Sequence, residues 1–253
     1  VLKENRMKRV IKKAAVGVGA LVLTLVAAVP ASSQVVHSIG FGGGVFVPRS
    51  CTDRLDCRVA RGSDDVLVED LNSLSFRVKD FRGGLVFGEW NTTFDDRVEL
   101  SLGAGFYRRT VPSVYTDFVD IDLSEIEQDL RLRVIPVSAV VRFLPFNRAG
   151  QLQPYFGAGV AALNWKYSET GEFIDFNNNN AVFEDHYVAS GTTFAPVLLG
   201  GLRMPINGDL YALNAEFRYQ FGKGNTGGSE NGFLAEKINL AGLNFTLGFQ
   251  IRF

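Results

Sequence analysis

Apolar and polar residues alternate with a period of two along much of the chain. In the clearest segment, 237–253, the odd positions from Ala241 to Phe253 are all apolar, whereas the even positions between them are small or polar. Successive side chains of a strand point to opposite faces, so this pattern predicts a strand with one apolar face. A helix face repeats every 3.6 residues and does not produce such a run.

The same alternation predicts eight strands, at 35–47, 81–91, 97–109, 130–144, 153–167, 192–204, 211–222 and 237–253. Strands of soluble sheets usually hold about 5 or 6 residues. These segments are long enough to cross a bilayer at a tilt, which takes about 9 to 11 residues. In the second strand, Glu89 is expected to face inward and Trp90 outward.

The connections between the strands alternate in length. Those at 48–80, 110–129, 168–191 and 223–236 are long, whereas those at 92–96, 145–152 and 205–209 are short and rich in turn residues such as Asn207-Gly208. A soluble β-sandwich has no reason to follow this rhythm. It predicts an all-β fold: an eight-stranded antiparallel up-and-down transmembrane β-barrel with four long extracellular loops and three short periplasmic turns.

The first 33 residues predict an export signal. Basic residues follow Met7, an apolar run covers 14–29, and Pro30-Ala31-Ser32-Ser33 supplies small residues for cleavage. A transmembrane anchor is the alternative, but the apolar run is shorter than the ~20 residues that span a bilayer. We therefore expect an upstream extension and cleaved signal peptide at 1–33, and an outer-membrane barrel domain at 34–253.

Charge and aromatic content fit an exported barrel. Without 1–33 the chain holds 20 basic and 26 acidic residues, a net charge of about −6, so no nucleic-acid partner is expected. The chain has 21 Phe, 7 Tyr and 2 Trp at a mean hydropathy of only +0.08. Rings near strand ends are expected to form interfacial girdles: Trp90, Phe94, Phe143, Phe146, Tyr155, Phe156 and Tyr211 at the short-turn rim, and Trp165, Tyr167, Phe194, Tyr219 and Phe221 at the other.

The two cysteines, Cys51 and Cys57, lie in a polar part of the first long loop. Two thiols alone make a poor zinc site, and an oxidising compartment favours a disulfide between them. No metal and no cofactor is expected. The acids of the second long loop, at 117–129, lack a regular cation-binding spacing.

Charged residues at inward-facing positions are candidates for ion pairs in the lumen. An eight-stranded barrel is just wide enough to be filled by its own side chains. Pairs between acidic and basic side chains would therefore close the bore, although the excess of arginine leaves an anion path open as an alternative. The candidates are Glu89, Arg97, Glu99, Arg109, Arg142, Arg203, Glu216, Arg218 and Arg252.

The chain resembles the small eight-stranded outer-membrane β-barrels represented by the OmpA transmembrane domain, OmpX and OmpW. The resemblance covers all of 34–253 and rests on the strand rhythm, on glycine-rich strands such as 40–48 and 154–160, and on the C-terminal strand with its final aromatic residue. It implies a monomer among outer-membrane lipid and lipopolysaccharide. It also implies an assembly signal for the barrel-assembly machinery, formed by Phe245, Leu247, Phe249, Ile251 and Phe253.

Catalysis has little support, and no catalytic residue is assigned. The only histidines, His37 and His186, are followed by Ser38-Ile39 and Tyr187-Val188, so the His-x-Ser of barrel lipid A deacylases is missing. The leading hypothesis is a non-enzymatic barrel with a structural role or a role in binding an extracellular ligand through its loops. An OmpW-like narrow channel for small molecules is the main alternative, and a lipid-modifying enzyme is disfavoured.

Overall fold

The computed structural model describes residues 35–49, 63–94, 97–146, 152–176, 178–206 and 210–253. Residues Val36–Phe253 form one compact unit, which holds the barrel. The signal-peptide segment up to residue 34 and the predicted Cys51–Cys57 disulfide lie outside the described residues. Within the described residues, no helix is both long and apolar enough to cross a membrane.

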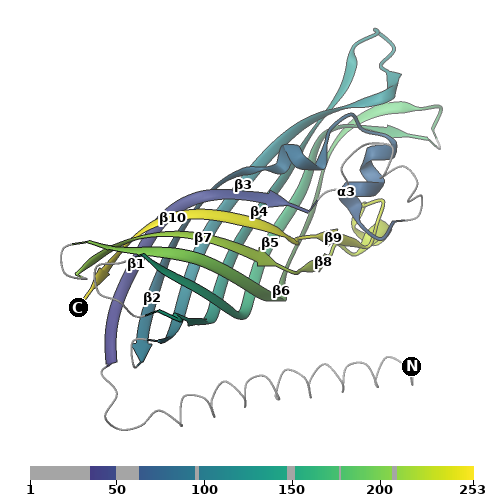
Figure 1. Cartoon of the computed structure of the whole chain (residues 1–253). Helices are drawn as coiled ribbons and strands as arrows, with labels where there is room; N and C mark the ends of the chain where they lie inside the picture. Colours follow the sequence, from purple (N-terminus) through teal and green to yellow (C-terminus); the bar gives the residue numbers. More distant parts are fainter. Residues whose placement is uncertain (1–34, 50–62, 95–96, 147–151, 177, 207–209) are drawn as a thin grey trace, which may run out of the picture. The chain divides into compact units, whose positions relative to one another are not determined.

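Eight strands close into one antiparallel barrel in the order β1-β10-β7-β6-β5-β4-β3-β2, which confirms the predicted fold (Figure 1). Each of the strands from β2 to β6 pairs with the next along the chain, as an up-and-down topology requires, and β10 pairs with both β7 and β1 to close the ring. The strands are β1 (Val35–Pro48), β2 (Gly83–Phe94), β3 (Val98–Val119), β4 (Glu125–Phe143), β5 (Gln153–Asp175), β6 (Ala181–Ile206), β7 (Tyr211–Gln220) and β10 (Gly242–Arg252).

Side chains alternate across the barrel wall as the sequence predicts. On β2, Glu89 is buried inside while Trp90 is 45% exposed on the outer face. On β10, Leu247 is exposed outside, whereas Thr246 and Gln250 are buried. The short-turn half of the wall therefore has an apolar outer face and a polar inner face, the reverse of a soluble protein.

The predicted long loops at 110–129 and 168–191 are corrected by the structure, because both are mostly strand. β3 continues to Val119 and β4 begins at Glu125, while β5 continues to Asp175 and β6 begins at Ala181. The ladder Gln153↔Arg203 to Asp175↔Ala181 runs the whole length of β5. In these extensions the regular apolar-outward pattern disappears although backbone pairing continues, so the alternation missed them.

The predicted last strand, 237–253, is also corrected. Lys237–Asn239 forms β9, which pairs with β8 (Lys223–Asn225) in a separate two-stranded sheet, and Ala241 is buried rather than outward-facing. Ile238 and Leu240 are almost fully buried. Burial of these two side chains turns the chain over the mouth of the barrel before β10 begins.

Two connecting segments form an apolar cap at the long-loop end of the barrel. Residues 63–82 contribute α3 (Val66–Glu69), η1 (Asp70–Asn72) and η2 (Val78–Phe81), and residues 228–240 contribute η3 (Gly228–Asn231) and β9. Their apolar side chains join inward-facing residues of the wall in one buried cluster. The cap members of this cluster are Val66, Leu67, Leu71, Leu74, Phe76, Val78, Phe81, Phe233, Ala235, Ile238 and Leu240.

Three rings assigned to the interfacial girdles lie inside the molecule instead. Trp165 and Tyr167 are 1% and 0% exposed and belong to the core beneath the cap, and Tyr155 is buried at the other end of β5. An added Cβ at Gly224 would lie 2.4 Å from the ring of Trp165, so only glycine allows β8 to pass so close. Trp90, Phe156 and Phe194 are exposed on the outer face as predicted.

The two faces of the wall exchange character along β4. Toward the short turn, the outward residues Val137, Ala139, Val141 and Phe143 are apolar, and Arg142 is buried inside. Toward the cap, Arg131 and Arg133 face outward while Leu130, Leu132 and Val134 are buried inside. The apolar outer belt therefore ends between Ile135 and Arg133, and beyond it the barrel is built like a soluble protein.

Candidate functional site

A charged network crosses the bore in its short-turn half. Arg142 on β4 lies at its centre and contacts three carboxylates: Nη2 is 2.7 Å from Glu89 Oε2 and 2.7 Å from Glu216 Oε2, and Nη1 is 3.1 Å from Glu99 Oε1. These glutamates come from β2, β7 and β3. Because β4 and β7 are not neighbours in the barrel, the contact to Glu216 spans the interior.

Two further arginines complete the network. Arg203 on β6 donates from Nη2 to both oxygens of Glu99, at 2.8 and 2.9 Å. Arg218 on β7 pairs with Glu216 at 2.8 Å and also donates to Ser138 Oγ at 3.2 Å. Three arginines thus face three glutamates, so the network is neutral overall. Arg142, Arg203 and Glu99 are at most 2% exposed.

Neutral side chains add hydrogen bonds to carboxylate oxygens that the arginines also contact. Thr93 donates to Glu99 at 3.0 Å, Ser101 donates to Glu89 at 3.2 Å, and Tyr155 donates to Glu216 at 3.2 Å. The guanidinium carbon of Arg142 also lies 5.3 Å from the centre of the Tyr155 ring, a cation–π distance. Charges buried this deeply are tolerated only when they are paired and hydrogen-bonded. Each charged group of the network is paired, although Arg142 Nε and Arg203 Nη1 are buried without a hydrogen-bond partner.

The structure brings six of the nine candidate residues into this network and leaves three outside it. Arg97 lies exposed in the turn between β2 and β3. Arg109 is exposed near the cap, where its Nε donates to the backbone carbonyl of Asp80 at 3.1 Å. Arg252 is partly exposed near the end of β10. All three occupy positions of inward parity in the sequence. They are nevertheless exposed, because they lie at or beyond the ends of the enclosed polar section of the barrel.

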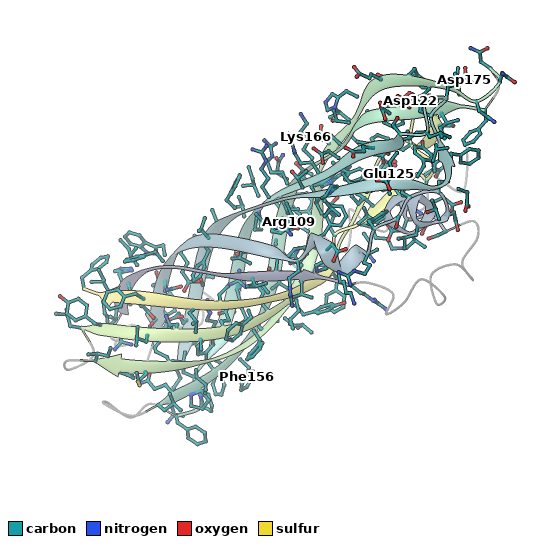
Figure 2. The ribbon with its side chains drawn as sticks, turned by 90° about the horizontal axis from the view of Figure 1, so that it is seen from above. Arg109, Asp122, Glu125, Phe156, Lys166 and Asp175 are labelled. Carbon is teal, nitrogen blue, oxygen red and sulfur yellow. The ribbon has the colours of Figure 1, made fainter. Side chains whose placement is uncertain are left out.

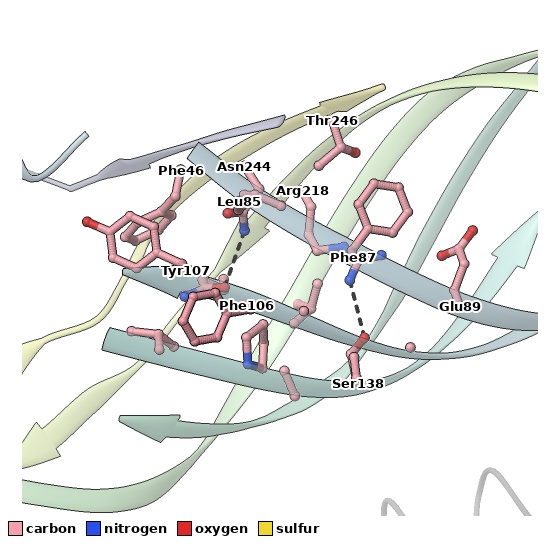
Figure 3. A pocket seen from close by; sticks show the side chains of 18 of the residues that line it. Phe46, Leu85, Phe87, Glu89, Phe106, Tyr107, Ser138, Arg218, Asn244 and Thr246 are labelled. Atoms are coloured by element: carbon pink, nitrogen blue, oxygen red, sulfur yellow. Dashed lines mark hydrogen bonds between the residues drawn. The ribbon is translucent and has the colours of Figure 1, made fainter. Parts of the chain in front are cut away.

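A small chamber of about 60 Å³ separates the charged network from the apolar part of the core (Figure 3). Phe46, Leu85 and Tyr107 line it on the cap side, and Glu216 and Arg218 line it on the network side. This is the volume open to the centre of a water-sized sphere, and one water needs roughly 10 to 15 Å³ of it. The chamber therefore holds only a few water-sized molecules. The charged network and the cap core therefore lie on opposite sides of this chamber.

A second buried polar cluster, which sequence reasoning missed, ties the cap to the wall. The hydroxyl of Tyr167 on β5 donates to Asp70 Oδ2 of η1 at 3.1 Å, and both residues are at most 2% exposed. Burial raises the pKa of Asp70 well above its usual range, and the like charge of Glu169 raises it further. Burial also raises the pKa of Glu169 to about 7. Glu169 lies beyond the outer apolar belt, so it titrates on the aqueous side.

This carboxyl pair predicts that the folded protein loses stability as pH rises. Between the ordinary pKa of 4.5 and the folded value of about 7, Glu169 holds more protons in the folded than in the unfolded chain. The stabilisation that the protonated Glu169 carboxyl contributes is therefore complete below about pH 4.5 and lost by about pH 7. Above pH 7, the free energy of unfolding of the Glu169→Gln variant is expected to be about 1 to 3 kcal/mol larger than that of the native protein.

Urea unfolding of vesicle-inserted protein at a series of pH values would measure this difference. The control is Glu184→Gln, which removes an exposed carboxylate from β6. It is expected to leave the pH dependence of the native protein unchanged. A Glu169→Gln curve parallel to the native curve across the whole range would show that this carboxyl does not carry the effect.

The remaining candidate chemistry is not gathered into a site. His37 contacts Thr92 at 3.2 Å and lies among Trp90 and Phe253 at the short-turn rim, while His186 is exposed on the β5–β6 hairpin. Among the described residues, no group of three or more histidines or carboxylates could hold a metal ion. The predicted assembly-signal residues from Phe245 to Ile251 lie on β10 between β1 and β7.

Strand order and register define the class of this protein as an all-β, eight-stranded antiparallel barrel. No protein-family model matches the chain, and no curated protein sequence matches it. Solved structures of similar fold include the N-terminal β-barrel domain of Pseudomonas aeruginosa OprF, with 15% identity over 88% of this chain and 100% of that chain at a TM-score of 0.38.

Two other structures are the attachment invasion locus protein Ail of Yersinia pestis and Neisserial surface protein A. Ail has 12% identity over 87% of this chain and 99% of its own, with a TM-score of 0.40. Neisserial surface protein A has 12% identity over 88% of this chain and 99% of its own, with a TM-score of 0.42. Because identities and TM-scores are this low, the assignment of the fold rests on the chain's own strand pairing.

Proposed function

We propose that the chain is a non-enzymatic integral outer-membrane β-barrel protein with a closed lumen. In this role the barrel anchors the cap and the two long hairpins, β3–β4 and β5–β6, at the cell surface. The observation that carries the proposal is the neutral network centred on Arg142, which fills the bore from β2, β3, β4, β6 and β7. A bore filled by paired side chains supports an anchoring role over transport.

Membrane insertion is supported by the outer face of the short-turn half. Large apolar side chains such as Leu102, Leu198 and Phe217 are more than half exposed there, although they would be buried in a soluble monomer. Closure pairs the backbone groups of all eight strands, which hydrocarbon requires. The expected export signal at 1–33, a monomeric state, and assembly through the outward residues of β10 belong to the same proposal.

A role in surface interaction is supported by the hairpin tips. Ile121 and Leu123 between β3 and β4 are 100% and 81% exposed, and Phe176 after β5 is 59% exposed. The rings of Phe118 and Phe176 lie 5.5 Å apart, so the two hairpins share one apolar patch. Exposed apolar side chains that cluster in this way mark interaction sites more often than chance. This patch is the expected contact for an extracellular ligand.

A closed lumen predicts no ion conduction. Protein refolded into planar bilayers is expected to give no single-channel steps in about 1 M potassium chloride, because paired charges leave no continuous water path. Folding is checked beforehand by the mobility shift between unheated and boiled samples on a detergent gel. Regular conductance steps from samples that pass this check would overturn the closed-lumen proposal.

The chamber beneath the cap favours one alternative, a narrow channel for small molecules. Its lining combines the apolar side chains of Phe46, Leu85 and Phe87 with polar groups of the network. Uptake of a small apolar solute into vesicles containing the protein would favour this function even without ion conduction. Equal uptake by empty vesicles would exclude it.

A further inference from the structure

A row of basic side chains lies on the outer wall, at the edge of the apolar belt that is nearer the cap. In the strand register, Arg108 of β3 is paired with Arg133 of β4, which is paired with Lys166 of β5. All three point outward, as Lys166 does in Figure 2. Arg131 adds a fourth outward basic residue two positions beyond Arg133 on β4.

The cations of this row lack protein counter-charges. Among the described residues, none of Arg108, Arg133 and Lys166 forms an ion pair, and Arg133 Nε is buried without a hydrogen-bond partner. Side chains at directly paired positions lie about 5 Å apart, and like charges in that arrangement destabilise a sheet. An anion from outside the chain that lay against this row would offset the repulsion between its members.

An apolar groove lies on the outer face of the barrel, on the short-turn side of the basic row. It is shallow because small residues line its floor, and the described residues that line it include Ala104, Val137, Ala139, Val160 and Ala162, with Phe194 at its edge. Ala104, Val137 and Ala162 are paired in register, two outward positions toward the short turns from the basic row. That offset is about 13 Å along the strand.

We propose that this surface binds a phosphorylated lipid, with its phosphate groups on Arg108, Arg133 and Lys166 and an acyl chain in the groove. The row lies where outward positions change from apolar to charged on three adjacent strands, which is the level of the lipid headgroups. Arginine binds phosphate in a bidentate manner, and lysine adds a point charge. The site rests on the proposed membrane insertion and supplies a specific lipid contact for it.

Lipid binding is measured by native mass spectrometry of the folded protein in detergent, titrated with diphosphorylated lipid A. Fully dephosphorylated lipid A and an excess of inorganic phosphate serve as separate arms. The native protein is expected to retain the phosphorylated lipid at least about ten-fold more strongly than the dephosphorylated form. Inorganic phosphate is expected not to displace it. Equal retention of the two lipids, or displacement by phosphate, would overturn the proposal.

Matched variants assign the contacts. Arg133→Gln with Lys166→Gln is expected to weaken lipid A binding about ten-fold or more. Lys79→Gln with Arg97→Gln removes the same charge elsewhere and is expected to change little. Only variants that keep the folded gel mobility are titrated, and Arg133→Lys, which retains the charge, is expected to bind nearly as the native protein does. Equal weakening by both double variants would assign binding to net charge alone and overturn the site.

The groove is tested separately. Ala139→Phe places a ring in its floor and is expected to weaken retention of lipid A, whereas Ala215→Phe makes the same change on the outer face of β7 and is expected to leave it unchanged. If these two variants retained lipid A equally, no acyl chain would lie in the groove. Conductance tests the closed lumen independently, so failure of the lipid site and failure of the proposed function remain distinguishable.

Discussion

Arg142→Met is expected to destabilise the folded barrel by about 3 to 5 kcal/mol, the usual cost of leaving a buried charge without its partner. In this variant Glu99 keeps its contact with Arg203 and Glu216 keeps its contact with Arg218. Glu89 makes its only described ion pair with Arg142. The loss should therefore arise chiefly from Glu89, and urea unfolding of vesicle-inserted protein would measure it.

A double variant makes this attribution testable. Adding Glu89→Gln to Arg142→Met is expected to recover at least half of the lost free energy, whereas adding Glu99→Gln should recover much less. Arg218→Met is the control, because that side chain is 20% exposed and pairs with a single glutamate, so its expected cost is about 1 kcal/mol. If Glu99→Gln rescued as well as Glu89→Gln, the proposed division of contacts within the network would be wrong.

Phe81→Ala is expected to release the cap while the barrel stays folded. Phe81 is fully buried at the end of η2, and its ring centre lies 6.2 Å from that of Phe76. Truncating a buried phenylalanine costs about 3 to 5 kcal/mol, and here the loss falls on a segment that the barrel strands do not need for pairing. Trypsin cleavage within 63–82, where Arg77 and Lys79 are sites, should accelerate about a hundredfold.

The control for cap release is Phe118→Ala, which removes a partly exposed ring from the β3–β4 hairpin. Cleavage of the cap in this variant should match that of the native protein, and both variants should keep the folded mobility on an unheated detergent gel. Unchanged cleavage of Phe81→Ala would show that the cap is not held by this core. Loss of the folded mobility would show that cap and barrel unfold as one unit.

The sequence alone predicted the fold well and the charged network in part. A period of two survives wherever one face of a strand is apolar and the other lines a polar lumen, so parity placed Glu89 inside and Trp90 outside. Parity could not show where the enclosed section ends, and for that reason it also nominated Arg97, Arg109 and Arg252. The choice of Arg142 as the centre of the network depends on the geometry across the bore, which no local pattern contains.

The cap shows the same limit more clearly. The apolar inward residues Leu130, Leu132 and Val134 were visible in the sequence, and beside the outward Arg131 and Arg133 they mark the end of the outer apolar belt. Nothing local shows that Phe81 and Ile238, which are more than 150 residues apart, belong to the same buried cluster as these wall residues.

Local alternation by itself determined the number of barrel strands and the face that most side chains of the short-turn half take, because successive side chains of a strand point to opposite faces. The alternation of long and short connections determined the antiparallel order. Only the tertiary structure decided which side chains meet inside the bore. Ion pairs across the barrel and packing of the cap join residues from strands and loops far apart in the chain, and their free energy depends on distances that exist only after the barrel has closed.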